Sequence, residues 1–160
     1  ANGLCQDISL GADDLWVDKD LDTVINLLGS RWKINEVLYH HAGIQPFDDK
    51  SIEVEVHFTP SWMYNPWANM KLQKYFKKNS QYQFDNHITE LGFSSVTSGF
   101  DCLYSLVHIF RHLFLEGIGL RQILDYYFIL KSSSVEERQE AYTIACRIGM
   151  KKFVSGLMAM

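Results

Sequence analysis

The chain has 160 residues, of which 47% are hydrophobic, 14% aromatic and 21% charged. This composition can bury a hydrophobic core, which excludes an intrinsically disordered chain and predicts a compact fold. The formal net charge of −4 provides no basic stripe for a phosphate backbone, so the sequence argues against nucleic acid as a partner.

The N-terminal part begins with a strand pattern that is followed by a helix pattern. Residues 12–17 follow a glycine and end in apolar side chains, which is typical of a short strand after a tight turn. A helix follows, because Asp18 or Asp20 can serve as its N-cap, apolar residues recur on one face, and Gly29 is a stop signal. This order predicts a strand, a turn and a helix in succession.

Further strands are predicted up to residue 58. Residues 33–47 alternate imperfectly between apolar and polar side chains, which indicates one or two strands. Residues 51–58 alternate strictly, with four apolar residues facing one way and Glu53, Glu55 and His57 facing the other. The polar face of this strand must meet either solvent or a functional site.

After residue 60 the pattern becomes helical. Residues 69–76 form a helical run, and the polar residues 77–97 predict a loop. Three aromatic residues could stack a nucleobase, or could pack an interface between lobes: Trp62, Tyr64 and Trp67.

Three helices are predicted in the remainder of the chain. Apolar residues spaced by three and four indicate a helix from residue 100, a break at residues 117–119 and a second helix up to residue 130. A final helix through Cys146 is predicted to begin at a capping box made by a serine and Glu137.

Strands followed by helices predict an α+β fold, with a short mixed β-sheet lobe followed by a helical lobe. The sheet lobe is expected over residues 1–60 and the helical lobe over residues 61–160, packed as one compact unit. Because the sequence begins without methionine, we expect a fragment of a longer protein that is truncated at its N-terminus.

The cysteines and the hydropathy pattern bear on the compartment. Cys5, Cys102 and Cys146 lie far apart and show neither CxxC nor metal-ligand spacing, which is typical of reduced thiols. No apolar stretch reaches the roughly 20 residues of a membrane-spanning helix, and the first residues do not have the pattern of a signal peptide. These features predict a cytoplasmic protein without a membrane partner.

Acidic residues at two places could hold a metal ion. Asp13 and Asp14 lie in the first strand pattern, and Glu53 and Glu55 lie in the alternating strand. Phosphoryl transfer from a nucleoside triphosphate needs Mg²⁺ held by carboxylates at one end of a sheet, because the ion neutralises the triphosphate and the leaving pyrophosphate. In the alternative interpretation the aspartates form a turn or a helix cap and the glutamates face solvent.

Three segments carry a resemblance to a known family: GADDLWV, YHHAGIQPFDDKSIEVEVHFTPSWMYNPWANMKLQKYF and LVHIFRHLFLEGIGLRQILDYYFIL. They resemble bacterial nucleotidyltransferases that occur especially in Bacteroides-type bacteria and that are similar to the DNA polymerase β-like nucleotidyltransferases. The resemblance covers residues 11–158. It implies transfer of a nucleoside monophosphate from a nucleoside triphosphate to an acceptor hydroxyl, with Mg²⁺ as cofactor. The acceptor itself is not identified by the sequence.

The resemblance assigns catalytic metal carboxylates to individual residues. Asp14 and Glu55 match the second and third carboxylates of the family, whereas Ala12 stands where the first is expected. Asp13 should point to the opposite face of its strand, so it can replace the missing ligand only through a bulge or a register shift. Either catalysis is lost, or the position has been altered, or Asp13 is recruited by local distortion. The family's triphosphate-binding loop should precede Gly11, so part of the nucleotide site is expected to be missing.

Two histidines of the helical part share a helix face. His108 and His112 are four residues apart and could bind zinc, although HIFRH lacks the glutamate of zinc proteases and a third ligand is not evident; a buried histidine pair is the alternative. By resemblance, four residues lie near the nucleotide or the acceptor: His108, His112, Arg121 and Asp125. Asp125 either forms only a helix salt bridge with Arg121 or holds this arginine so that it meets a phosphate.

Histidines of the strand region are further candidates. His57 shares the polar strand face with Glu55 and is assigned to nucleotide or acceptor binding. His40 and His41 end a predicted strand near Glu55 and recur in the family, although histidines at strand ends are often surface residues.

The sequence therefore predicts a nucleotidyltransferase-like protein with an incomplete carboxylate metal site. The main alternative is a catalytically impaired nucleotide-binding or protein-interaction module that keeps the fold, and a zinc hydrolase built on HIFRH is a third interpretation. Metal-dependent nucleotide binding with pyrophosphate release would support the enzyme. Metal-independent binding would support the module, and stoichiometric zinc would support the hydrolase.

Overall fold

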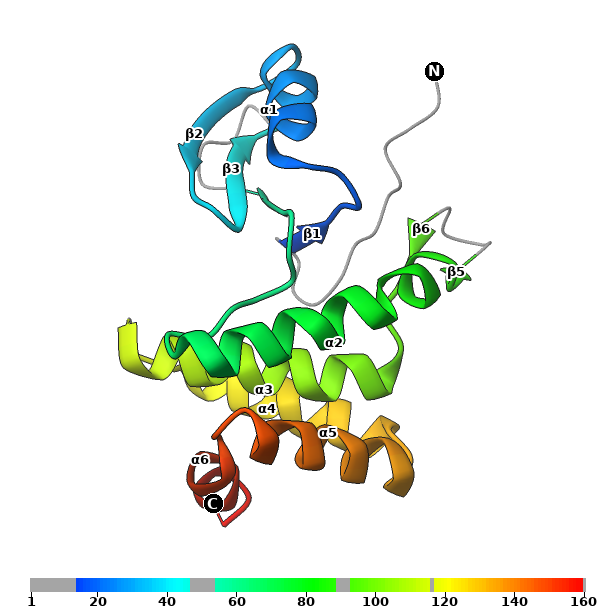
Figure 1. The fold of residues 1–160 in the computed structure, drawn as a ribbon, viewed down its shortest axis with the longest axis vertical. Helices are drawn as coiled ribbons and strands as arrows, with labels where there is room; N and C mark the ends of the chain where they lie inside the picture. Colours follow the sequence, from blue (N-terminus) through cyan, green and yellow to red (C-terminus); the bar gives the residue numbers. More distant parts are fainter. Residues whose placement is uncertain (1–13, 47–53, 89–92, 116, 160) are drawn as a thin grey trace. The chain divides into compact units, whose positions relative to one another are not determined.

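The computed structural model describes residues 14–46, 54–88, 93–115 and 117–159. A four-stranded mixed sheet with one helix near the N-terminus is followed along the chain by a mostly helical region, so the fold is α+β, as the sequence predicts (Figure 1). The chain divides into two compact units, one within Ala1–Pro60 and Lys78–Val96 and the other within Ser61–Lys77 and Thr97–Met160. The division into a sheet lobe over residues 1–60 and a helical lobe over residues 61–160 stays a prediction.

The first unit contains a mixed sheet. Its described elements are β1 (Asp14–Trp16), α1 (Leu21–Gly29), β2 (Lys33–Val37), β3 (His41–Gln45), β4 (Val54–His57), β5 (His87–Ile88) and β6 (Phe93–Ser94). β1 to β4 form one sheet in the order β1-β4-β3-β2, in which β1 is parallel to β4 and the other neighbours are antiparallel. β5 and β6 form a separate antiparallel pair. β1 and β4 are therefore neighbours although α1, β2 and β3 lie between them in sequence.

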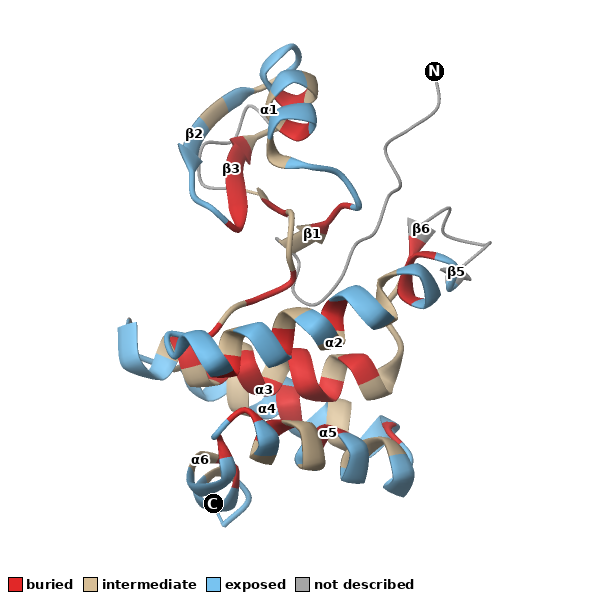
Figure 2. Ribbon diagram, in the orientation of Figure 1, coloured by how far each residue is buried: buried red, intermediate tan, exposed pale blue. Residues whose placement is uncertain are grey.

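One face of the four-stranded sheet and α1 form a hydrophobic core. Six buried residues make up this core: Val17, Val24, Leu28, Ala42, Ile44 and Val56. Figure 2 shows β3 buried along most of its length, in keeping with its place between β4 and β2. Asp20 is the N-cap of α1, because its Oδ1 accepts a hydrogen bond from the Thr23 amide (2.9 Å), so one of the two predicted caps is confirmed. Val54 also packs on the core, as the predicted alternation requires.

The prediction of a loop over residues 77–97 is wrong in its first part. α2 spans Pro66–Phe84, so the helix continues for about two turns beyond the predicted run. The continuation has no apolar periodicity, which hid it, but several of its residues are lysine or glutamine, which are good helix formers. Phe84 is buried at its end, and its ring lies 4.6 Å from the ring of Trp16 in the same unit. Tertiary packing therefore supports a helical segment whose own sequence is mostly polar.

The second unit is helical. Besides the first part of α2, its described helices are α3 (Ser98–Leu115), α4 (Leu120–Ser132), α5 (Val135–Arg147) and α6 (Lys151–Leu157). α3 packs against both α4 and α5. Its buried face supplies much of the core of this unit: Phe100, Cys102, Leu103, Leu106, Val107 and Ile109. The break predicted at residues 117–119 is confirmed, because it separates α3 from α4.

α5 begins at the capping box that the sequence predicts. Ser134 Oγ accepts a hydrogen bond from the Glu137 amide (3.1 Å), and Glu137 Oε2 accepts one from the Ser134 amide (2.7 Å). Glu137 Oε1 also accepts hydrogen bonds from Ser98 Oγ (2.9 Å) and the Gly99 amide (3.1 Å), so one carboxylate joins the N-termini of α3 and α5. A further helix that was not predicted from the sequence, α6, begins just after Gly149, which takes a φ of 90° and ends α5.

Asp101, in the first turn of α3, is a largely buried carboxyl group. Burial raises the pKa of Asp101 from 3.8 to about 6, although a hydrogen bond from Ser105 Oγ (2.8 Å) opposes this effect. Because the folded state then binds the proton more tightly than the unfolded state, stability decreases as the pH rises from about 4 to 6. We expect Asp101→Asn to raise the free energy of unfolding by about 2 kcal/mol at about pH 7.5 and to change it little at about pH 4, as measured by urea denaturation.

The matched control for this prediction is Ser105→Ala. It removes the hydrogen bond to Asp101 but leaves the carboxyl group buried, so it should lower stability rather than raise it. An equal gain for Asp101→Asn at both pH values would contradict a carboxyl group whose pKa is raised in the folded state.

Thiols and helix lengths bear on the predicted compartment. Cys102 and Cys146 are free thiols, and Cys5 lies outside the described residues. In the part of the chain that the structure describes, no helix combines the length and the hydropathy needed to cross a membrane. The cytoplasmic location stays a prediction.

Candidate carboxylate and histidine site

The structure brings Asp14 and Glu55 together on one face of the sheet. β1 and β4 pair in parallel register, and in this register Asp14 lies directly beside Glu55. Residues that pair across neighbouring strands project to the same face, so both carboxylates lie opposite the hydrophobic core. Asp13, Ala12 and Glu53 lie outside the described residues, and a catalytic role for Asp13 stays a prediction.

Two histidines lie on the same face as these carboxylates. His57 is two residues after Glu55 on β4, and His41 of β3 pairs with His57 across the antiparallel ladder. Both residues are buried, with His57 only 4% and His41 only 6% exposed. From the sequence, His41 is expected near Glu55, with a surface residue at a strand end as the alternative. We call these four residues, Asp14, His41, Glu55 and His57, the carboxylate–histidine cluster.

Polar contacts join the members of the cluster. His57 Nε2 donates a hydrogen bond to Glu55 Oε2 (3.2 Å) and lies 3.4 Å from Asp14 Oδ1. His41 Nδ1 lies 3.5 Å from the same Glu55 oxygen, and its Nε2 lies 3.7 Å from Glu36 Oε2. The Nδ1 atoms of both histidines are buried and have no hydrogen-bond partner among the described residues. Glu55 is therefore the centre of the cluster, with a ring nitrogen on either side.

Contacts within the cluster also shift the pKa values of His57 and Glu55. Burial by itself disfavours the charged ring of His57, but hydrogen bonds to Asp14 and then to Glu55 outweigh burial and raise the pKa of His57 to about 9. The hydrogen bond from His57 lowers the pKa of Glu55, against the opposing effect of partial burial. The same contacts that favour a proton on His57 would therefore favour another positive charge at this place.

The donor atoms of the cluster suit a divalent cation. Carboxylate oxygens are the ligands that Mg²⁺ prefers, and imidazole nitrogens suit transition metal ions. Throughout the described ranges, one group of three or more His, Cys, Asp or Glu residues has donor atoms that all lie within 4.8 Å of one another: His41, Glu55 and His57. Asp14 borders this group through His57 Nε2. The residues present therefore fit a bound metal ion.

A comparison with protein-family models identifies the family. The model of a family described as uncharacterised nucleotidyltransferase matches residues 11–160. The chain belongs to this nucleotidyltransferase family. No curated protein and no solved structure was found to match the chain. Nucleotidyltransferases typically use a divalent metal ion, which agrees with the chemistry of the cluster.

The other residues assigned to the nucleotidyltransferase site belong to the second unit. His108 and His112 lie on one face of α3 with ring centroids 4.3 Å apart, and Tyr104 Oη lies 3.4 Å from His108 Nδ1. Arg121 Nε and Asp125 Oδ2 are 3.7 Å apart on the surface of α4, with side chains 85% and 63% exposed. Their role in nucleotide or acceptor binding stays a prediction. Among the described residues, no third potential ligand joins the two histidines in a metal-binding group, so the structure offers no support for a zinc hydrolase.

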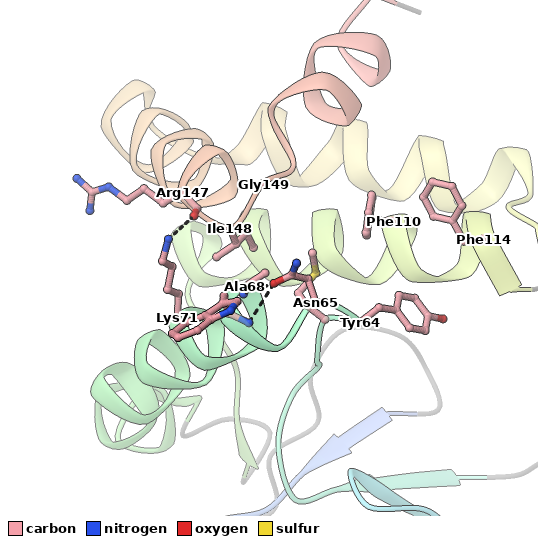
Figure 3. A pocket seen from close by; sticks show the side chains of 11 residues that line it. Tyr64, Asn65, Ala68, Lys71, Phe110, Phe114, Arg147, Ile148 and Gly149 are labelled. Carbon is pink, nitrogen blue, oxygen red and sulfur yellow. Dashed lines mark hydrogen bonds between the residues drawn. The ribbon is translucent and has the colours of Figure 1, made fainter.

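The second unit of this nucleotidyltransferase contains a cavity of about 500 Å³ (Figure 3). Tyr64 and Trp67 line it, whereas the ring of Trp62 packs beneath the guanidinium group of Arg111, which lies 4.7 Å from the ring centroid. The remaining lining residues come from α2 and the segment before it, from α3, and from the end of α5 and the two residues after it: Met63, Asn65, Ala68, Lys71, Phe110, Phe114, Arg147, Ile148 and Gly149. Sequence reasoning missed this cavity, because its walls come from three segments that are distant along the chain.

Proposed function

We propose that this nucleotidyltransferase transfers a nucleoside monophosphate from a nucleoside triphosphate to an acceptor hydroxyl, as the DNA polymerase β-like enzymes do. Asp14 and Glu55 bind the divalent cation, with Mg²⁺ as the expected ion. The observation that carries the proposal is the parallel pairing of Asp14 with Glu55 on the polar face of the sheet, in a chain of a nucleotidyltransferase family. A Bacteroides-type source belongs to the same proposal.

The chemistry follows from the charges. The acceptor oxygen attacks the α-phosphorus, the bond from this phosphorus to the oxygen that bridges to the β-phosphate breaks, and pyrophosphate leaves while the hydroxyl proton passes to solvent or to a carboxylate. A bound cation neutralises the triphosphate and the charge that develops on pyrophosphate. Asp14 and Glu55 position that charge, so catalysis consists mostly of orientation and electrostatic stabilisation.

Residues of the second unit have a supporting part in the proposal. His108, His112 and Arg121 contact the triphosphate or the acceptor, and Asp125 orients Arg121. The contact between Arg121 and Asp125 leaves most of the guanidinium surface exposed, which suits an arginine that meets a phosphate. His57 would contribute to nucleotide binding through its place beside both carboxylates.

A binding module without catalysis is the second candidate function. Ala12 favours it, because this residue stands where the resemblance places the first metal carboxylate. In this case the chain would bind a nucleotide or a protein partner but would release no pyrophosphate.

A nucleotide assay separates the two candidates. The purified chain is titrated with ATP, GTP, CTP and UTP, with Mg²⁺ and with a chelator, while calorimetry records binding and a coupled assay records pyrophosphate. We expect metal-dependent binding of at least one nucleotide, together with pyrophosphate release in the presence of a mixture of hydroxyl acceptors. Binding that is independent of metal, or binding without any pyrophosphate release, would favour the module.

A further inference from the structure

Two histidines give the proposed metal site a nitrogen-rich ligand set. On β4, Glu55 and His57 alternate onto one face, and His41 of β3 pairs with His57 there. Gly43, which pairs with Glu55, adds no side chain to this face. Three donor atoms from two adjacent strands thus meet over a position without a side chain.

The separations in this group are those expected of ligands to one ion. Charge-assisted hydrogen bonds between nitrogen and a carboxylate are usually about 2.7–2.9 Å long. Glu55 Oε2 lies 3.2 Å from His57 Nε2 and 3.5 Å from His41 Nδ1, which is longer. Ligands that lie about 2.0–2.2 Å from a tetrahedral metal ion are roughly 3.3–3.6 Å from one another. Both separations are close to this range, so an ion between these atoms would need little rearrangement of the side chains.

Glu36 supplies an outer contact for this site. His41 Nε2 lies 3.7 Å from Glu36 Oε2 while its Nδ1 faces Glu55. Histidine ligands of metal ions usually direct their second ring nitrogen at a carboxylate or a carbonyl group, which fixes the ring and makes the ligand more basic. Glu36 stands in that position. Its own side chain is 59% exposed, so it can be altered without disturbing the core.

We infer that His41, Glu55 and His57 form a mixed nitrogen and oxygen site that binds a first-row transition metal ion, such as Zn²⁺ or Mn²⁺, in preference to Mg²⁺. Mg²⁺ favours oxygen ligands in octahedral geometry, whereas imidazole nitrogen favours transition metal ions. Asp14 borders the ion, and positions not filled by protein remain for substrate oxygens. The inference deepens the proposed function and rests on it, because Glu55 is a metal ligand in both.

Direct measurement of metal binding tests the inference without an acceptor. The full chain is freed of metal with a chelator and titrated calorimetrically with ZnCl₂, MnCl₂ and MgCl₂. We expect one equivalent of Zn²⁺ or Mn²⁺ to bind at least about 10-fold more tightly than Mg²⁺. His41→Gln and His57→Gln should weaken transition metal binding by about 100-fold or more and change Mg²⁺ binding little, and Co²⁺ should give a visible absorption band that both variants lose.

Substitution of the buried histidines can unfold the chain, so a variant at an exposed residue provides a second test. Glu36→Gln should weaken Zn²⁺ binding by about 10-fold while the circular dichroism spectrum and the unfolding midpoint stay unchanged. The matched control is the double variant His108→Gln/His112→Gln, which removes the paired histidines of α3. It should bind one equivalent of Zn²⁺ with the affinity of the wild type.

The outcomes separate this inference from the proposed function. Tighter binding of Mg²⁺ than of Zn²⁺ and Mn²⁺, or loss of the ion only in the α3 double variant, would overturn the inference. Pyrophosphate release that Zn²⁺ or Mn²⁺ supports equally in wild type and in His41→Gln would also overturn it, while the proposed function would stand. Transition metal binding at the cluster without nucleotide binding or pyrophosphate release would support the inference and contradict the proposed function.

Discussion

Asp14→Asn should lower the rate of pyrophosphate release by at least about 10³-fold, which corresponds to about 4 kcal/mol of transition-state stabilisation. Asparagine keeps the shape of the side chain but removes the negative charge that lies beside Glu55 and His57. A metal ion contributes several kcal/mol by stabilising charge in the transition state, and a neutral ligand holds the ion less firmly. The rate is measured at saturating nucleotide and metal, so that a change in affinity alone is not mistaken for a change in chemistry.

Asp22→Asn is the matched control for this prediction. Asp22 is exposed in the first turn of α1, in the same unit, so its loss changes the net charge by the same amount without touching the cluster. We expect its rate to stay within about 2-fold of wild type, because surface charges contribute little. If Asp14→Asn kept its activity, the proposal that Asp14 binds the catalytic cation would be wrong.

Local sequence patterns predicted most of the individual elements. The strict alternation of residues 51–58 placed Val56 inward and Glu55 outward, and this is what β4 has in its described part. N-cap and capping-box residues, Asp20 and Glu137, predicted the starts of two helices. These signals work because they depend on contacts between residues at most four positions apart.

Pairing between distant strands could not be predicted from such patterns. The parallel pairing of β1 with β4 needs a connection through three other elements, and no spacing in the sequence sets its register. The family resemblance, rather than the alternation, suggested that Asp14 and Glu55 share a site. The contact of His41 with Glu55 depends on the antiparallel register of β3, so the sequence could place His41 near Glu55 but could not assign it to the same face of the sheet.

Helices without an apolar stripe were equally hard to predict. Residues 77–84 continue α2 with a mostly polar sequence, and Phe84 is held by Trp16 from a distant strand. α6 follows Gly149 and lies beyond Cys146, through which the last helix was predicted to run. In both cases tertiary contacts supplied the stability that the local pattern did not reveal.

Phe100→Ala should destabilise the helical unit by about 3–5 kcal/mol, because it empties the space between α2 and α3. Phe100 is only 2% exposed, and its ring lies 6.0 Å from Tyr75 and 5.6 Å from Phe76. Small domains are stable by only about 5–15 kcal/mol in total, so this loss would remove a large share of their stability. Urea denaturation followed by circular dichroism measures the change in the free energy of unfolding.

Phe128→Ala provides the comparison within the same unit. Phe128 lies on α4 and is 60% exposed, so its truncation should change the free energy of unfolding by no more than about 0.5 kcal/mol. Equal losses in the two variants would mean that Phe100 does not lie in a packed core. The cluster draws all its ligands from β1, β3 and β4, so its Zn²⁺ binding can be followed separately from the helical unit. In one outcome, Phe100→Ala loses much stability and still binds Zn²⁺ as wild type does at urea concentrations below its unfolding transition. This result would indicate that the sheet unit keeps its site when the helical unit is weakened.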